Sequence, residues 1–189
     1  MQFINTILFA ATALASLASA HNTVDFINQD NTIRHIVFTS QEDTGAAKIQ
    51  DLIVPGLGTA SQTFPTGWIG NWFSYNEGQK HDLGMLGEVR FDGWDGLVFF
   101  DVSAIVNASD NDGVKVLYPK GLNPAHSSTP VSGCQTPICA NRYNNWDDVA
   151  TKATKITDLV CLIGNLATTE RRRDAKVYPR SFITGESSA

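Results

Sequence analysis

Short runs in which apolar and polar residues alternate recur through most of this chain, and turn-forming residues separate them. Alternation with a period of two is typical of β-strands that bury one face. The runs span residues 23–28, 33–39, 52–55, 63–65, 67–75, 87–91, 97–103 and 114–118. Strands at this spacing, with Gly and Asp between them, predict a mainly β fold, an antiparallel β-sandwich.

Two local details refine this prediction. The runs at 23–28 and 33–39 are joined by the short polar segment Gln29-Asp30-Asn31-Thr32, which predicts a hairpin between them. The segment from Asp147 to Leu159 is the one stretch typical of a helix, because an aspartate suits the N-cap and apolar residues follow along one side. We therefore expect a sandwich with one short helix.

Residues 1–20, MQFINTILFAATALASLASA, contain an apolar run without a charged side chain and end in Ala18-Ser19-Ala20, a pattern that signal peptidase accepts. They predict a signal peptide, with His21 as the first residue of the mature chain. No later segment reaches the length of about 18 apolar residues that a spanning helix needs. The sequence thus predicts a secreted protein, extracellular or in the cell wall, without a membrane partner.

The remaining chain divides into a domain and a tail. Residues 21–165 have a usual size for one domain. Residues 166–189 are polar, include Arg171-Arg172-Arg173, and are expected to form a disordered tail that a processing protease can cut. The chain has 19 acidic and 14 basic residues, a net charge of −5, and a surface of this sign does not favour a nucleic-acid partner. The oligomeric state stays open.

Two kinds of covalent modification are expected from the sequence. Cys134, Cys139 and Cys161 allow one intramolecular disulfide and leave one thiol, and the sequence does not decide the pairing. Asn107-Ala108-Ser109 is an acceptor for N-glycosylation, which predicts a solvent-facing turn there.

The segment LGEVRFDGWDGLVFFDVSAIVNASDNDGVKVLYP, residues 86–119, resembles the central signature of thaumatin-like proteins. In that signature a Leu-Ala-Glu-Phe strand and a glycine turn lead to a Phe-Tyr-Asp-Val-Ser strand. TVDFINQDNTIRHIVFTS is similar to the family's first hairpin, and GWIGNWFSYNEG resembles its Trp-x-Gly-Arg-x-Trp strand. Compact fungal secreted proteins with the elements SGCQTPIC and DLVCLIG look closer still, and some of them carry a deoxyribonuclease label.

The resemblance implies a thaumatin-like β-sandwich with a reduced loop domain, since most of the family's cysteines are missing. It also implies an acidic cleft that binds β-1,3-glucan and, in some members, hydrolyses it slowly. Glu88 matches the cleft glutamate and Asp101 matches the aspartate of Phe-Tyr-Asp-Val-Ser. Val98 stands where another cleft aspartate is expected, and the family's arginine is absent, so the cleft is incomplete.

Glycoside hydrolysis needs two carboxyl groups on either side of the scissile bond, about 5–9.5 Å apart. Glu88 and Asp101 on neighbouring strands are the candidate catalytic pair. The candidate binding residues, which offer charge, hydrogen bonds or aromatic stacking, are Arg90, Asp92, Trp68, Trp72, Tyr75 and Trp94. Asp95 is assigned to the turn at residues 93–96. The competing interpretation is a solvated strand face with surface ion pairs.

The favoured function is binding of cell-wall β-glucan or a related polysaccharide, with a weak endo-β-1,3-glucanase as an alternative. A second alternative is copper binding by the mature N-terminal His21, with His35, His81 or His126 as its partner; otherwise no cofactor is expected. A secreted deoxyribonuclease or a host-interaction protein is a further alternative. Asp110-Asn111-Asp112-Gly113 resembles the start of a calcium loop but is better interpreted as a turn.

Overall fold

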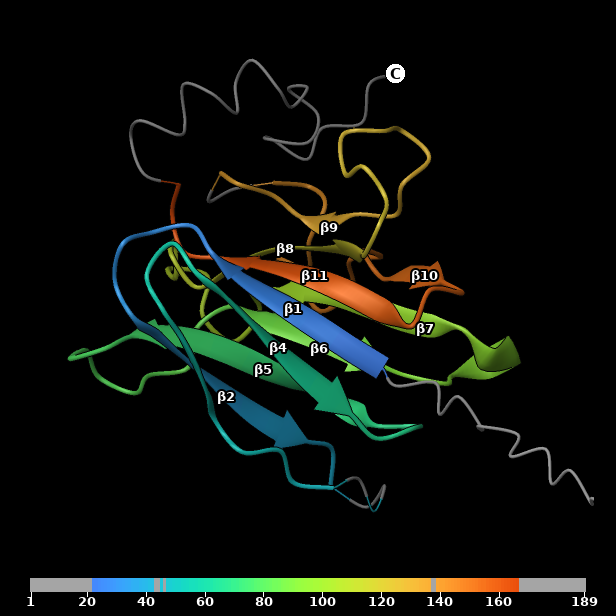
Figure 1. Cartoon of the computed structure of the whole chain (residues 1–189). Coiled ribbons are helices and arrows are strands. Elements are labelled where there is room, and N and C mark those ends of the chain that lie inside the picture. Colours follow the sequence, from blue (N-terminus) through green and yellow to red (C-terminus); the bar gives the residue numbers. More distant parts are fainter. Residues whose placement is uncertain (1–21, 43–44, 46, 137–138, 167–189) are drawn as a thin grey trace, which may run out of the picture.

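The structure is a computed structural model, and it describes residues 22–166 except for residues 43–44, 46 and 137–138 (Figure 1). The predicted signal peptide, His21 and all but the first residue of the predicted tail lie outside the described residues. Within the described part of the chain, no helix is long and apolar enough to cross a membrane.

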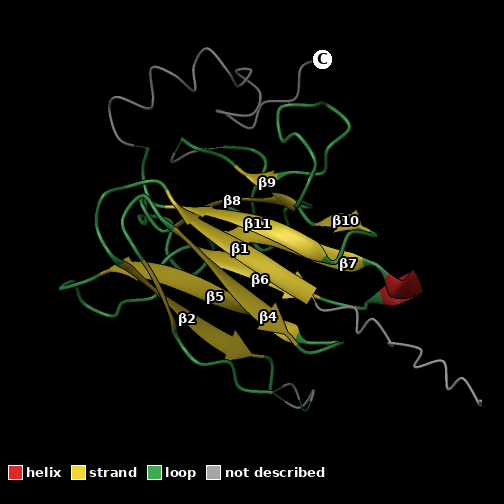
Figure 2. Ribbon diagram, viewed as in Figure 1, coloured by secondary structure: helices red, strands yellow, loops and turns green. Residues whose placement is uncertain are grey.

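Two β-sheets pack face to face (Figures 1 and 2). Sheet A has the strand order β4-β1-β11-β8-β9, and sheet B has the order β10-β7-β6-β5-β2-β3. The strands are β1 (Asn22–Asn28), β2 (Arg34–Ser40), β3 (Leu52–Val54), β4 (Thr59–Phe64), β5 (Ile69–Asn76), β6 (Leu86–Arg90), β7 (Val98–Ser103), β8 (Val114–Pro119), β9 (Ser132–Gly133), β10 (Lys152–Thr154) and β11 (Asp158–Ile163). The predicted mainly β sandwich is confirmed. Its described strand pairs are antiparallel apart from the parallel pair of β1 and β11.

The space between the sheets is filled by aromatic and aliphatic side chains from both of them. Phe26 of β1 contacts Phe38 of β2 and Trp72 of β5, with ring centroids 5.8 and 5.5 Å apart and the rings close to perpendicular. Edge-to-face contacts of this kind add to the free energy gained from burying the rings. The alternation in the sequence therefore reflects one core that both sheets share.

The predicted hairpin between residues 23–28 and 33–39 is wrong. β1 pairs with β4 and β11 in sheet A, whereas β2 pairs with β3 and β5 in sheet B. The connection between them crosses from one sheet to the other, and the Asn28 side chain donates a hydrogen bond of 2.7 Å to the Thr32 carbonyl within it. Both strands present a buried face to the core, so their alternation is satisfied by packing across the sandwich instead of by pairing.

The predicted helix from Asp147 to Leu159 is also wrong. This segment instead contains turns, the short strand β10 and the start of β11, which lies in the middle of sheet A. Val149, on the expected apolar side, is 95% exposed. The Asp148 carboxylate accepts hydrogen bonds from the backbone amides of Asn144 and Asn145 at 2.7 and 2.8 Å, so it closes a turn. Tertiary packing of the strand prevails over a short helical pattern.

The only helix among the described residues is the single 3-10 turn η1 (Trp94–Gly96), drawn in red in Figure 2. It occupies the predicted turn between β6 and β7, so the assignment of Asp95 to a turn is confirmed. Asp95 has a φ of 58°, in the left-handed region that aspartate tolerates better than most side chains.

The cysteine pairing that the sequence left open is decided by the structure. Cys134 and Cys139 form a disulfide that closes a short loop after β9. Cys161 is a free thiol buried in β11, and its burial raises the pKa of the thiol to about 12. The disulfide indicates an oxidising compartment, as expected for an extracellular protein.

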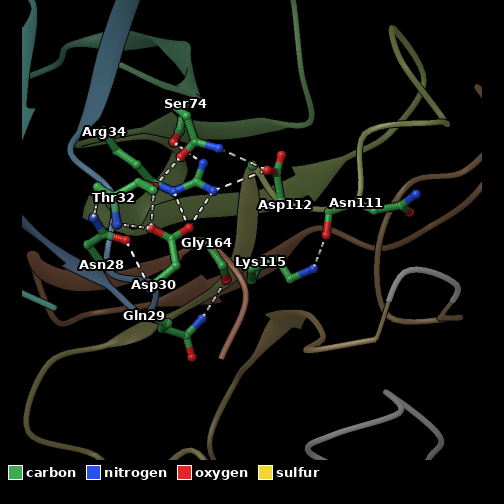
Figure 3. A network of polar contacts seen from close by, with 12 residues as sticks. Asn28, Gln29, Asp30, Thr32, Arg34, Ser74, Asn111, Asp112, Lys115 and Gly164 are labelled. Atoms are coloured by element: carbon green, nitrogen blue, oxygen red, sulfur yellow. Dashed lines mark hydrogen bonds and ion pairs between the residues drawn. The ribbon is translucent and has the colours of Figure 1, made fainter. Parts of the chain in front are cut away.

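A network of polar contacts surrounds the buried Arg34 side chain (Figure 3). The Arg34 side chain is fully buried and donates two hydrogen bonds to one oxygen of Asp30, from Nε at 2.9 Å and from Nη2 at 2.6 Å. It also donates to Ser74 at 3.1 Å and lies 3.4 Å from Asp112. These contacts stabilise the crossing from β1 to β2, because buried charge is tolerated only when it is paired.

Candidate functional site: an acidic groove on sheet B

The face of sheet B that points away from the core carries a row of polar residues in matching register. Glu88 of β6 lies between Asn71 of β5 and Asp101 of β7, and Thr39 of β2 continues the row beside Asn71. Side chains alternate along a strand, so Arg90 projects from the same face as Glu88. The short connection between β6 and β7 thus brings the two carboxyl groups predicted from the sequence directly beside each other.

This row lines an open groove with a volume of about 670 Å³. Phe99 of β7 adds an aromatic side chain to the lining, and Ile105, Tyr143 and Trp146 contribute from the loops beyond β7 and β9. Trp146 is 85% exposed. The groove therefore combines paired acids with aromatic surface that is open to solvent.

The Asp101 carboxyl group, when protonated, forms a hydrogen bond with the neighbouring Glu88 side chain. Burial of Asp101, and then the charge of Glu88, raise the pKa of Asp101 to about 7. Asp101 Oδ1 is buried and accepts no hydrogen bond from a described donor.

The other oxygen of Asp101 is held by a second chain segment. Thr151 Oγ1 donates a hydrogen bond of 3.2 Å to Asp101 Oδ2, and the Tyr143 hydroxyl lies 2.9 Å from the same Thr151 oxygen. The backbone of Tyr143 is in turn bridged to Ser103 at the end of β7. These contacts fix both the acid pair and one aromatic wall of the groove.

Only Arg90, among the six candidate binding residues, lines the groove. Trp68 and Trp72 are 1% and 0% exposed, so they belong to the core and offer no ring face to a ligand. The Trp68 ring nitrogen donates to the Ala47 carbonyl at 3.0 Å. This burial corrects the prediction that the two tryptophans bind a ligand. Their spacing in the sequence allows either the core face or the outer face of the sheet, and both rings pack against Phe64 on the core face.

The three remaining candidates lie elsewhere on the surface. Tyr75 stacks on His35 with ring centroids 5.0 Å apart, away from the groove. Trp94 is 79% exposed on η1, and Asp92 stands just before that turn with a φ of 52°. None of them lines the groove.

Sequence reasoning missed Phe99, Tyr143, Trp146 and Thr151. The stretch Asn144-Asn145-Trp146-Asp147-Asp148 contained a usable signal, because a tryptophan among polar turn residues has no core strand to belong to. The prediction of a helix beginning at Asp147 conflicts with that signal.

Of the candidate copper ligands, His21 lies outside the described residues, so copper binding stays a prediction. His35 stacks on Tyr75, His81 packs against Phe73 and Tyr75, and His126 is bonded to Ser128. In the described ranges no three His, Cys, Asp or Glu side chains come together as metal ligands would.

The interpretation of residues 110–113 as a turn is confirmed. Asp110 Oδ1 accepts hydrogen bonds from the backbone amides of Asp112 and Gly113 at 3.0 and 2.9 Å, and its Oδ2 accepts one from Met85 at 2.6 Å. Both oxygens of this carboxylate are therefore committed to backbone amides.

Fold and groove together define a β-sandwich protein with an acidic, aromatic-lined groove on the outer face of one sheet. No family model matches the sequence. The chain is 42% identical over 142 residues to the antigenic protein SchS21 of Stachybotrys chartarum, an alignment that covers 75% of this chain and 94% of that protein. The chain therefore belongs to the family of SchS21.

A solved structure with the same fold is the protein elicitor MoHrip2 from Magnaporthe oryzae. The match has a TM-score of 0.54, covers 76% of this chain and 98% of MoHrip2, and shows 13% sequence identity. At this identity the comparison demonstrates a shared fold alone.

Proposed function

We propose that this protein is secreted and binds cell-wall β-glucan or a related polysaccharide in the groove around Glu88 and Asp101. The observation that carries the proposal is one groove holding both a hydrogen-bonding pair of carboxyl groups and the exposed ring of Trp146. Aromatic rings offer flat apolar surface to a sugar, and carboxyl and amide groups fix its hydroxyls. We also propose that the protein is related to thaumatin-like proteins. The resemblance to that family assigns the same two residues, Glu88 and Asp101, to a cleft that binds glucan.

The acid pair favours binding over hydrolysis. Two carboxyl groups that hydrogen-bond to each other leave no room for a glycosidic bond between them, because glycosidases keep theirs about 5–9.5 Å apart with the substrate between them. Glu88 and Asp101 sit opposite each other on adjacent strands, where side chains converge. We accordingly propose a binding protein instead of a glucanase.

The names of the two similar proteins support the proposed secreted location. SchS21 is an antigenic protein and MoHrip2 an elicitor, and both words describe proteins that another organism detects. A disulfide in the described domain fits the same compartment. A protein secreted into the medium or the cell wall can reach a wall polysaccharide.

A pull-down on insoluble β-1,3-glucan, chitin and chitosan tests the function. We expect wild type to be retained on at least one of them, and Trp146→Ala to weaken retention about two- to tenfold because a stacking surface is lost. The double variant Glu88→Gln/Asp101→Asn should weaken it too. Trp94→Ala is the matched control, since Trp94 is similarly exposed but lies outside the groove. Equal loss for both tryptophan variants, or no retention of wild type on any polysaccharide, would contradict the proposal.

We also propose that Asn107 is N-glycosylated during secretion. Its side-chain oxygen accepts hydrogen bonds from the Ser109 amide and hydroxyl at 3.1 and 2.7 Å, which hold the acceptor sequence in a partly exposed turn. Protein from a eukaryotic secretory host should lose mass on treatment with an N-glycosidase, and Asn107→Gln and Ser109→Ala should each abolish that loss. An unchanged mass of the wild-type protein after treatment would show that the site is unused.

A further inference from the structure

We infer that the groove selects wall polysaccharides bearing protonated amino groups, which is the chemistry of deacetylated amino sugars, over neutral polysaccharides. The inference rests on the proposed function and names the class of sugar that the same site prefers. Its basis is the unbalanced charge of the groove together with the placement of aromatic side chains around the acid pair.

The groove contains more acids than cations. Glu42, Glu88 and Asp101 are its carboxyl groups, whereas Arg90 is the only lysine or arginine among the described residues that line it. Neither Glu88 nor Asp101 forms an ion pair with a described side chain. A positively charged ligand therefore balances the excess negative charge of the groove, and an anionic polysaccharide would be repelled.

An ammonium group of a ligand can take the place of the proton on the acid pair. In the free protein below about pH 7, a proton on Asp101 relieves the repulsion between the carboxyl groups, while the buried Asp101 Oδ1 has no hydrogen-bond partner among the described residues. An ammonium group has three N–H donors and can bond to both carboxylates at once. When it binds, the proton on Asp101 leaves to solvent and both acids become anions, so the positive charge of the ligand substitutes for that of the proton.

Aromatic rings complete the arrangement. Trp146, Tyr143 and Phe99 line the same groove as the pair, and a cation is attracted to the face of an aromatic ring, most strongly to that of tryptophan. The other titratable groups in the lining are Glu42, Arg90 and the Tyr143 hydroxyl, which is bonded to Thr151. Carboxylates and rings in one groove form a site suited to an amine-bearing sugar, while an N-acetylated sugar or a glucan gains stacking and hydrogen bonds to its hydroxyls but no charge pairing.

Calorimetric titration at pH 6 with oligomers of equal length tests this preference. The ligands are a glucosamine oligomer, an N-acetylglucosamine oligomer and a β-1,3-glucan oligomer. We expect the glucosamine oligomer to bind at least about tenfold more tightly than the other two, in line with a charge-assisted hydrogen bond to each acid. Its binding should weaken with added salt and release a proton, which appears as a heat that depends on the buffer.

Variants separate the acid pair from charge in general. Glu88→Gln should remove most of the preference for the amine while leaving the weaker binding of neutral oligomers. Glu77→Gln makes the same change of charge at a carboxylate that is 60% exposed and does not line the groove, so it should leave the preference unchanged. Thermal unfolding of both variants checks that they are folded.

The remaining outcomes would overturn either the inferred preference for amine-bearing sugars or the proposed function itself. Equal affinity for amine-bearing and neutral oligomers would overturn the inference while the proposed function stands, and failure of all three to bind would overturn the proposed function itself. Equal losses for Glu77→Gln and Glu88→Gln would show non-specific charge attraction and overturn the inference. An oligolysine peptide that binds the groove more tightly than the sugar would also overturn it, because the partner would then be a protein.

Discussion

Replacing Asp30 with alanine should lower the free energy of unfolding by about 3–5 kcal/mol, because it leaves the charge of Arg34 buried without its main partner. The Arg34 side chain is fully buried, and two of its nitrogen atoms donate to a single Asp30 oxygen at 2.9 and 2.6 Å. Asp30 also accepts hydrogen bonds from the Thr32 amide and hydroxyl, so the crossing between the sheets loses a second support. Denaturant unfolding measured by tryptophan fluorescence reports the change.

Asp112→Asn provides the matched control. This carboxylate lies 3.4 Å from Arg34 and its side chain is 43% exposed, so solvent screens the pair and its loss should cost about 0–1 kcal/mol. Equal destabilisation by the two variants would mean that Asp30 is not the main counter-charge. The double variant Asp30→Ala/Arg34→Met should recover part of the stability, since an apolar side chain needs no partner in that space.

Arg34 also illustrates what the sequence can and cannot predict. The alternation around it correctly identified a strand, because side-chain orientation along a strand is a local property. Its burial was not predictable, since Asp30 is supplied by a connection between sheets and Asp112 by a distant loop. The same limit explains the hairpin error: alternation indicates that a face is buried but does not say which strand lies beside it.

The candidate site is likewise predictable from the sequence only in part. Glu88 and Asp101 were correctly assigned to neighbouring strands because a short turn joins β6 to β7 and sets their register. Trp146 and Thr151 reach the groove through the contact of Tyr143 with Ser103, two residues that lie far apart in the sequence. Long-range contacts of this kind have no local signal, so the aromatic wall of the groove required the structure.

The stability of the protein should fall as the pH rises from about 4 to about 7 because of Asp101. Burial, and then the charge of Glu88, raise its pKa from the ordinary value of 3.8 to about 7 in the folded protein. Between these values the folded chain binds more protons at this site than the unfolded chain, and the free energy of unfolding therefore decreases with increasing pH. Above about pH 7 the acid is ionised in both states and its contribution no longer changes.

Asp101→Asn should abolish this slope and make the protein more stable than wild type at pH 8 by about 1–3 kcal/mol, the cost of a buried polar atom without a partner. Thermal unfolding at pH 5 and pH 8 measures both effects, with Glu77→Gln as the variant that should keep the wild-type slope. Lys115 acts in a separate window, because burial lowers its pKa from 10.5 to about 8 and its contribution makes stability rise with pH between those values. A slope below pH 7 that survives in Asp101→Asn would show that a group other than Asp101 binds the proton.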